Sequence, residues 1–267
     1  MSPRALRRAV CGAAAAVCVV VALPALAQQA PQKPATPPKA GADLSGVWLV
    51  RGSHENPADF ARYPDSEWST EKLPFTPAGK AKFDANKPGR GPRQVTPAQR
   101  NDPQQGANPN GLYRTLMYPR LWEFVQTPAK VVQLFGWGSV WRNIYADGRA
   151  VPDDVAAGPF WDGYSVGHWE GDTLVATTLA LDDRAWLDEW GTPFTADARI
   201  EERWKRIAPD RLQLTITVND PEYYTRPWTS VPLIFALQPK SEPQEIIFAP
   251  MDVENFNRTL RDPSAPK

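Results

Sequence analysis

The feature that most constrains this chain is a series of short strand–turn–strand patterns that begins near residue 121. Residues 164–169 and 173–178 alternate in polarity and flank Glu170-Gly171-Asp172, which is a strong hairpin signal. A strand at residues 43–50 opens the series. Similar patterns predict further strands at residues 122–126, 131–135, 139–145, 199–206, 212–218, 228–237 and 245–248. Little helix is expected between them.

A meander of this length would leave two long edge strands with unpaired backbone groups, and closure of the sheet removes both edges. We therefore predict an all-β fold, an antiparallel up-and-down β-barrel of the lipocalin-like kind with about eight to ten strands. A β-sandwich is the alternative.

The first 27 residues have the pattern of a cleaved signal peptide. A basic start is followed by an apolar run from Ala9 to Leu26, and Ala25-Leu26-Ala27 has the small-x-small pattern of a cleavage site. A retained membrane anchor and a lipidated Cys18 are the alternatives. The pattern predicts a periplasmic or secreted protein. Both cysteines, Cys11 and Cys18, would leave with the signal, so we expect no disulfide or thiol chemistry.

Cleavage would remove three arginines and no acidic residue, so a formal net charge of zero would become −3. A net charge of this sign does not favour binding to nucleic acid. No later segment is long and apolar enough to cross a membrane. Residues 28–42 are predicted to be a flexible linker, and residues 43–267 a single domain.

Residues 52–120 are too rich in proline to hold a long strand. One helix is expected there, with Thr76 as N-cap, Pro77 in the first position and residues 78–86 following. The rest of this Pro-rich excursion is predicted to pack on the domain or over one of its ends.

Two charged residues fall on apolar strand faces. In Arg199–Arg206 the alternation places Glu202 on the face that carries Ile200 and Trp204, and Arg142 lies on the apolar face of residues 139–145. A buried charge is costly unless it is paired. If the strands bring them together, the two residues form an internal pair. One interpretation is a structural salt bridge. The other makes Glu202 a general acid or base and Arg142 an anion- or carbonyl-binding group.

Tyr164 and His168 share one strand face with Val166, so both are candidates to join Glu202 and Arg142 in a cavity. The alternative for His168, one residue before Trp169 of the hairpin, is a place at the rim. Aromatic residues and one arginine are predicted to line that cavity or its mouth. These ligand-binding candidates are Tyr145, Trp204, Tyr224, Arg226 and Trp228. Aromatic residues also build ordinary barrel cores, so a structural role is the alternative for this set.

Two other motifs carry less weight. Residues 163–167 match Gly-x-Ser-x-Gly, but a nucleophilic serine needs a strand-to-helix turn, and here another strand follows. The acidic run at residues 182–189 suits a solvated loop as well as a hard cation, and His54 and His168 are the only histidines. We therefore predict neither a metal nor a cofactor.

The run Trp169-Glu170-Gly171-Asp172-Thr173-Leu174 resembles a specific motif of a group of exported bacterial β-rich proteins. Residues 124–128, 144–149, 165–175, 186–188, 202–204 and 224–229 resemble the same group, so the likeness covers most of residues 43–237. Gly46-Val47-Trp48 resembles the opening of lipocalin-like barrels. In the group, histidine is common at the positions of Tyr164 and Phe194, and a Cys-Pro-rich loop replaces residues 108–111. The resemblance implies an exported β-rich fold and lends no activity.

Together these patterns predict an exported protein that binds a small apolar or aromatic molecule in an aromatic-lined interior. It would act as a cofactor-free acid–base enzyme (a lyase, isomerase or hydrolase). A lipocalin-like binding protein without turnover is the first alternative, and a structural or envelope-associated interaction domain is the second.

Overall fold

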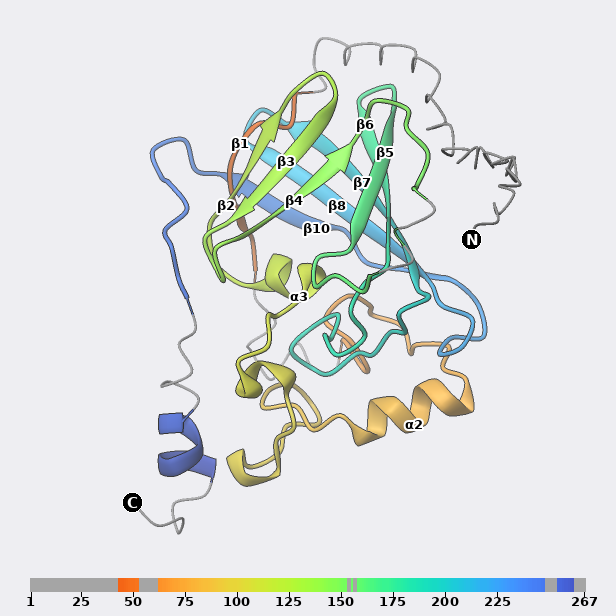
Figure 1. The fold of residues 1–267 in the computed structure, drawn as a ribbon, viewed down its shortest axis with the longest axis vertical. Coiled ribbons are helices and arrows are strands. Elements are labelled where there is room, and N and C mark those ends of the chain that lie inside the picture. The colour runs from red at the N-terminus through yellow and green to blue at the C-terminus, as the bar shows by residue number, and fades with distance from the viewer. Residues whose placement is uncertain (1–42, 53–61, 153–154, 156–157, 248–253, 262–267) are drawn as a thin grey trace, which may run out of the picture. The chain divides into compact units, whose positions relative to one another are not determined.

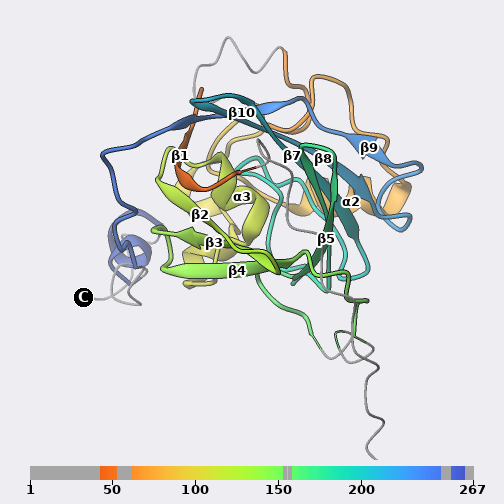
Figure 2. The same cartoon turned by 90° about the horizontal axis from the view of Figure 1, so that it is seen from above.

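Ten strands of this protein form one sheet that closes into a barrel (Figures 1 and 2). The computed structural model describes residues 43–52, 62–152, 155, 158–247 and 254–261, so the predicted signal peptide and linker lie outside the described residues. The strands are β1 (Gly46–Val50), β2 (Trp122–Gln126), β3 (Lys130–Phe135), β4 (Val140–Tyr145), β5 (Tyr164–Glu170), β6 (Thr173–Leu179), β7 (Arg199–Ala208), β8 (Arg211–Asn219), β9 (Trp228–Thr229) and β10 (Leu233–Leu237). The predicted all-β barrel is confirmed.

The barrel closes because β10 pairs with both β8 and β1. The closed ring contains β1 to β8 and β10, which is nine strands, while β9 pairs only with the far end of β8. A ring with an odd number of strands cannot alternate in direction all the way round. One parallel pair resolves this, and it lies between β4 and β5, where Ile144 is opposite Ser165 and Tyr145 is opposite Val166. The expectation of sequential hairpins throughout is therefore wrong at this junction, where the connection from residue 146 to 163 returns the chain to the same end.

Two other expectations for the strands need correction. The predicted strand at 228–237 is two strands, because Pro232 lacks a donor and the backbone N–H of Val231 leaves the ladder to bond the carbonyl of Trp68 at 2.8 Å. The segment predicted as a strand at 245–248 contributes a single parallel bridge, between Ile246 and Trp137, and residue 248 lies outside the described residues.

The described part of the Pro-rich excursion, residues 62–120, contains two α-helices and two short 3-10 helices. Helix α2 (Pro77–Ala85) begins as predicted, since the Thr76 hydroxyl accepts a hydrogen bond from Gly79 N at 3.1 Å. The elements η1 (Pro97–Gln99), η2 (Pro103–Gly106) and α3 (Leu112–Met117) follow, and a π-helical turn, η4 (Asn257–Arg261), lies near the C-terminus. Helix α3 was not predicted. It is entirely buried and lies at one end of the barrel (Figures 1 and 2).

The barrel interior is filled by its own aromatic side chains. Trp122, Phe124, Trp204 and Phe235 are each at most 1% exposed, and neighbouring rings among them have centroids 4.9–5.8 Å apart, mostly edge to face. They come from β2, β7 and β10, so inward-facing positions of opposite walls meet. Packing of this kind, rather than disulfides, stabilises the fold.

One carboxylate holds the loop before β7 against the Pro-rich excursion. Asp188 is fully buried and accepts hydrogen bonds from the hydroxyls of Ser66 (2.6 Å) and Thr192 (2.7 Å). It also accepts backbone N–H groups of Glu67, Trp190 and Thr192 at 3.0–3.1 Å. Five donors thus replace the water that this charge loses on burial. These hydrogen bonds therefore hold the excursion and the loop before β7 together.

Helix α2 packs on the chain at Tyr223 so closely that only glycine fits at position 79. A Cβ there would lie 2.1 Å from the backbone oxygen of Tyr223. Alanine normally stabilises a helix interior relative to glycine by about 1 kcal/mol. We expect Gly79→Ala to lower the free energy of unfolding by about 2 kcal/mol, as measured by urea unfolding. Ala81→Gly, on the exposed face of α2, is the control and should cost only about 1 kcal/mol. A stabilised Gly79→Ala variant would contradict this packing.

Candidate functional site

Glu202 and Arg142, which the strand alternation placed inward, meet inside the barrel. Glu202 on β7 is fully buried and Arg142 on β4 is 4% exposed. The guanidinium binds the carboxylate with two parallel hydrogen bonds, Nη1 to Oε1 at 2.8 Å and Nη2 to Oε2 at 2.6 Å. This bidentate geometry is the strong form of an arginine–carboxylate pair.

Both Glu202 and Arg142 make further hydrogen bonds. Glu202 also accepts hydrogen bonds from the Tyr113 hydroxyl (2.9 Å), the Thr178 hydroxyl (2.8 Å) and Trp204 Nε1 (2.8 Å). Arg142 Nε donates to Gln133 at 2.8 Å, and its Nη1 also lies within hydrogen-bond distance of Ser165 at 3.2 Å. The pair therefore joins β3, β4, β5, β6 and β7 to helix α3.

These contacts fix the protonation state of Glu202. Burial by itself would raise the pKa of the carboxyl, but Arg142 and the hydrogen bonds lower it below its ordinary value. The carboxylate accepts five hydrogen bonds and is ionised, so it has little capacity left to take a proton from a ligand. The geometry favours the structural interpretation of this pair over the acid–base one.

Tyr164 and His168 do not join the pair. On β5 the buried Ser165 contacts Arg142 and Trp169 packs against the core, so position 167 also faces inward and Tyr164 and His168 point outward. His168 has a side chain 65% exposed and lies 3.2 Å from Glu170 on the surface. The expectation that the two residues line the interior is wrong, because alternation defines two faces of a strand but does not say which one is inside. Ser165 lies within a continuous strand, so it is no nucleophile elbow.

The ligand-binding candidates are dispersed. Tyr145 faces outward, with its ring beside Tyr164 and under the guanidinium of Arg149. Trp204 belongs to the aromatic core and donates to Glu202. These positions do not define a common site.

The remaining three candidates lie near β9. Tyr224 and Trp228 are buried, and the Tyr224 hydroxyl donates to the carbonyl of Pro193 at 2.6 Å. Arg226 is exposed on the loop between them. The two rings therefore have a packing role here.

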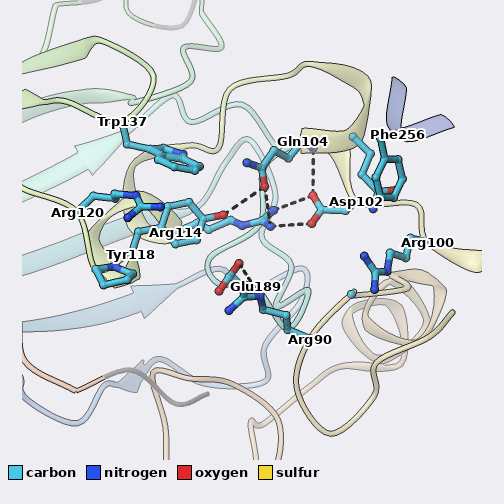
Figure 3. Close-up of a pocket in the computed structure, with 13 residues that line it drawn as sticks. Arg90, Arg100, Asp102, Gln104, Arg114, Tyr118, Arg120, Trp137, Glu189 and Phe256 are labelled. Carbon is cyan, nitrogen blue, oxygen red and sulfur yellow. Dashed lines mark hydrogen bonds and ion pairs between the residues drawn. The ribbon is translucent and has the colours of Figure 1, made fainter. Parts of the chain in front are cut away.

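A cleft of about 610 Å³ lies where the Pro-rich excursion meets α3 and the β3–β4 turn (Figure 3). Its lining includes four arginines and two carboxylates, together with aromatic rings. The residues that carry its chemistry are Arg90, Arg100, Arg114, Arg120, Asp102, Glu189, Tyr118, Trp137 and Phe256. In Figure 3, Trp137 and Arg120 lie at one end of the cleft and Arg100 and Phe256 at the other, with Arg114 and Asp102 between them.

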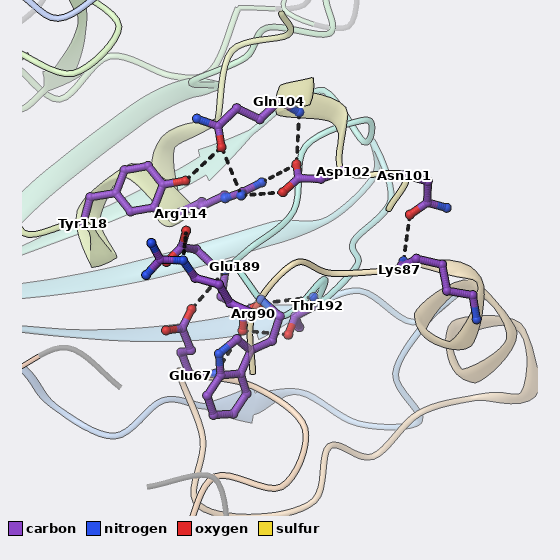
Figure 4. A network of polar contacts seen from close by, with 12 residues as sticks. Glu67, Lys87, Arg90, Asn101, Asp102, Gln104, Arg114, Tyr118, Glu189 and Thr192 are labelled. Atoms are coloured by element: carbon purple, nitrogen blue, oxygen red, sulfur yellow. Dashed lines mark hydrogen bonds and ion pairs between the residues drawn. The ribbon is translucent and has the colours of Figure 1, made fainter. Parts of the chain in front are cut away.

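The centre of the cleft is a buried ion pair. Arg114 on α3 donates to Asp102 through Nη1 at 2.7 Å and Nη2 at 2.6 Å, and Nη2 lies 3.2 Å from Gln104 Oε1 (Figure 4). Burial would lower the pKa of Arg114, but Asp102 and its other polar neighbours more than offset this and raise it. Arg90 lies 3.6 Å from Glu189, whose own N–H donates to Glu67 at 3.0 Å.

A second, smaller pocket of about 120 Å³ lies beside α3 and shares Trp137 with the cleft. It is lined by Asp162, which directly precedes the Gly163 turn into β5, and by the loop from Ala107 to Gly111. Asp162 is partly buried and makes no hydrogen bond or ion pair with any described residue. Burial raises the pKa of Asp162 to about 6, against an opposing effect of Arg142.

The residues of the cleft and of the small pocket were missed by sequence reasoning. They lie on loops of the Pro-rich excursion, on helix α3, around the β3–β4 turn, before β5 and β7 and near the C-terminus, and no single periodic pattern joins these segments. One available signal was the density of arginine in the excursion, at positions 90, 93, 100, 114 and 120.

Fold and contacts together define a closed, mostly antiparallel β-barrel protein with a polar pair sealed inside and an arginine-lined cleft at one end. Comparisons with protein-family models, curated proteins and solved structures gave no match to this chain. In the part of the chain that the structure describes, no helix has the length and apolar character needed to cross a membrane. The same residues contain no cluster of three or more histidine, cysteine or acidic side chains that would hold a metal ion.

Glu202→Gln tests the structural role of the buried pair. The amide leaves Arg142 charged and uncompensated, so we expect the free energy of unfolding to fall by about 3–5 kcal/mol, as measured by urea unfolding. Glu201→Gln is the matched control, because Glu201 is the next residue on β7 and its side chain is 46% exposed. Its effect should stay within about 0.5 kcal/mol. Equal effects of the two substitutions would rule out the role described for the pair.

The raised pKa of Asp162 predicts a pH-dependent gain in stability for Asp162→Asn. An ionised Asp162 is less favourable in the folded protein than in the unfolded chain, so it lowers stability above pH 6, and the penalty disappears as the pH falls toward 4. We expect the variant to gain about 1–3 kcal/mol at pH 7.5 and little at pH 4. Urea unfolding at both pH values measures this. The exposed Asp197→Asn is the control, and a gain of equal size at both pH values would contradict the assignment.

Proposed function

We propose that this protein binds a small molecule that carries an anionic group and an apolar or aromatic part, and that the ligand occupies the arginine-lined cleft. The observation that carries the proposal is the composition of the cleft: four arginines face two carboxylates in a volume of about 610 Å³. Sites for small molecules are typically about 300–1,000 Å³ and have a few polar groups among apolar walls.

The charge of the cleft favours an anion. Asp102 is fully engaged by Arg114, and Glu189 lies near Arg90, so the remaining positive charge is that of Arg100 and Arg120. The Arg100 guanidinium packs over the backbone at Gly89, where an added Cβ would lie 2.8 Å from it. Its one hydrogen bond with a described residue is a long contact, 3.5 Å from Nε to the carbonyl of Val95. Its remaining donors are thus available to a carboxylate or phosphate.

The walls of the cleft favour an apolar or aromatic part on the ligand. Tyr118 packs edge to face against Trp137 with ring centroids 5.1 Å apart, and the Arg120 guanidinium lies 5.0 Å from the Trp137 centroid. Phe256 adds a third ring. A flat ligand with an anionic end therefore finds stacking surfaces and a cation in the same cleft.

The barrel interior is less well suited to a ligand. Glu202 and Arg142 satisfy each other, the aromatic rings around them are packed, and neither residue lines the cleft or the small pocket. The proposed ligand is still a small molecule, as the sequence predicted, but its site is the cleft at the end of the barrel and not the barrel interior. Turnover by Glu202 has no support from these contacts.

Isothermal titration calorimetry with phenyl phosphate at low ionic strength tests the proposal, with benzyl alcohol as the uncharged comparison. We expect saturable binding of phenyl phosphate and none of the alcohol. Arg100→Gln and Arg120→Gln should each weaken binding about tenfold, since a charge-assisted hydrogen bond contributes about 1.5–3 kcal/mol. Arg226→Gln, an exposed arginine away from the cleft, is the control. Binding that depends on Arg226, or that ignores Arg100 and Arg120, would place the ligand elsewhere.

A further inference from the structure

We propose that the small pocket at Asp162 is a second binding site, separate from the cleft, and that it takes a short primary alkylammonium group. The site is independent of the proposed anion site, because the two share only Trp137 among their lining residues. It is formed by the connection before β5, the loop before α3 and the start of β4.

Two side-chain acceptors of the pocket have no hydrogen-bond donor among the described residues. Asp162 makes no hydrogen bond or ion pair with a described residue. Asn110, only 7% exposed, also lines the pocket, and its side-chain oxygen is buried without a hydrogen-bond partner among the described residues. An unpaired buried acceptor such as the Asn110 oxygen is rare and costly in folded proteins, and the partly buried Asp162 carboxylate lies in the same pocket. A ligand that brings several N–H donors would satisfy both oxygens.

The charge of the pocket matches a monocation. Asp162 is the only titratable side chain among the residues that line it. Arg142 on β4 lowers the pKa of Asp162 by its charge, and that charge is balanced by Glu202 through two hydrogen bonds. An incoming ammonium therefore meets one uncompensated carboxylate and no uncompensated arginine.

The walls select an alkylammonium over a bare metal ion. Pro109, Trp137, Val140 and Ile247 line the pocket with apolar surface, which does not coordinate a metal. Hard cations such as Ca²⁺ take six to eight oxygen ligands, whereas the side chains here offer one carboxylate, the amides of Asn108 and Asn110 and the hydroxyl of Thr115. The volume of about 120 Å³ corresponds to about four water molecules in the liquid, which is enough for a short alkyl chain.

Titration with n-propylammonium chloride, followed by ¹H–¹⁵N NMR, tests this site. Gly111 and Gly138 line the pocket and report on it, and Gly171, in the exposed β5–β6 turn, is the internal control. We expect saturable shifts at the first two glycines at pH 7.5 and affinity about tenfold weaker at pH 5, where Asp162 is mostly protonated. Asp162→Asn should abolish the shifts and Asp197→Asn should preserve them.

Three results would overturn the proposal. One is the absence of saturable shifts in the wild-type protein while its spectrum stays that of a folded chain. Another is equal binding of 1-propanol, which would show that the apolar walls act without the carboxylate. The third is saturation of the same shifts by KCl or CaCl₂ at matched ionic strength, which would make this an inorganic cation site. Thermal unfolding of Asp162→Asn, expected at no lower temperature than wild type, shows that lost binding is not lost folding.

Discussion

The bidentate pair of Arg142 and Glu202 is the interaction on which the rest of the structure depends. It ties two walls of the barrel together at a point where the chain has no covalent cross-link among its described residues, and it draws Tyr113 of helix α3 into the interior. The next residue, Arg114, points the other way, into the cleft, where it binds Asp102. Consecutive positions on one short helix thus couple the barrel interior to the cationic cleft.

Glu202 and Asp162 differ in how many hydrogen bonds their carboxylates accept. This difference distinguishes a carboxylate with a structural role from one that is a candidate to bind a ligand. Glu202 accepts five hydrogen bonds and has a lowered pKa, whereas Asp162 accepts none from described residues and has a raised pKa. Burial, complete for Glu202 and partial for Asp162, by itself raises the pKa of both carboxyls, so burial alone does not explain the difference. A carboxylate with every lone pair engaged stabilises a fold, and one with none engaged is available to a ligand.

Strand alternation predicted the barrel and the inward direction of Glu202 and Arg142, because charged residues flanked by apolar ones reveal a buried face. The same reasoning failed on β5. The inward-facing positions of β5 include Ser165 and Gly167, and small or polar residues of this kind are typical of a solvent-exposed face. They are small because Arg142 needs the Ser165 hydroxyl, and because a Cβ on Gly167 would lie 2.9 Å from the carbonyl of Val175. The interior is polar and crowded at this level, and apolar patterning alone does not reveal that.

The cleft was beyond sequence reasoning for a different reason: its side chains come from segments that lie far apart in the sequence. Arg93, which does not line the cleft, joins two of these segments, because it donates to the carbonyls of Phe83 in the excursion and Trp190 in the loop before β7 at 2.7 Å. Such contacts leave no periodic trace in the sequence. Within the cleft, Arg114 is held in place by Asp102 and Gln104, so it loses little conformational freedom when an anion arrives. The proline-rich segment, too irregular for strands, is well suited to that role.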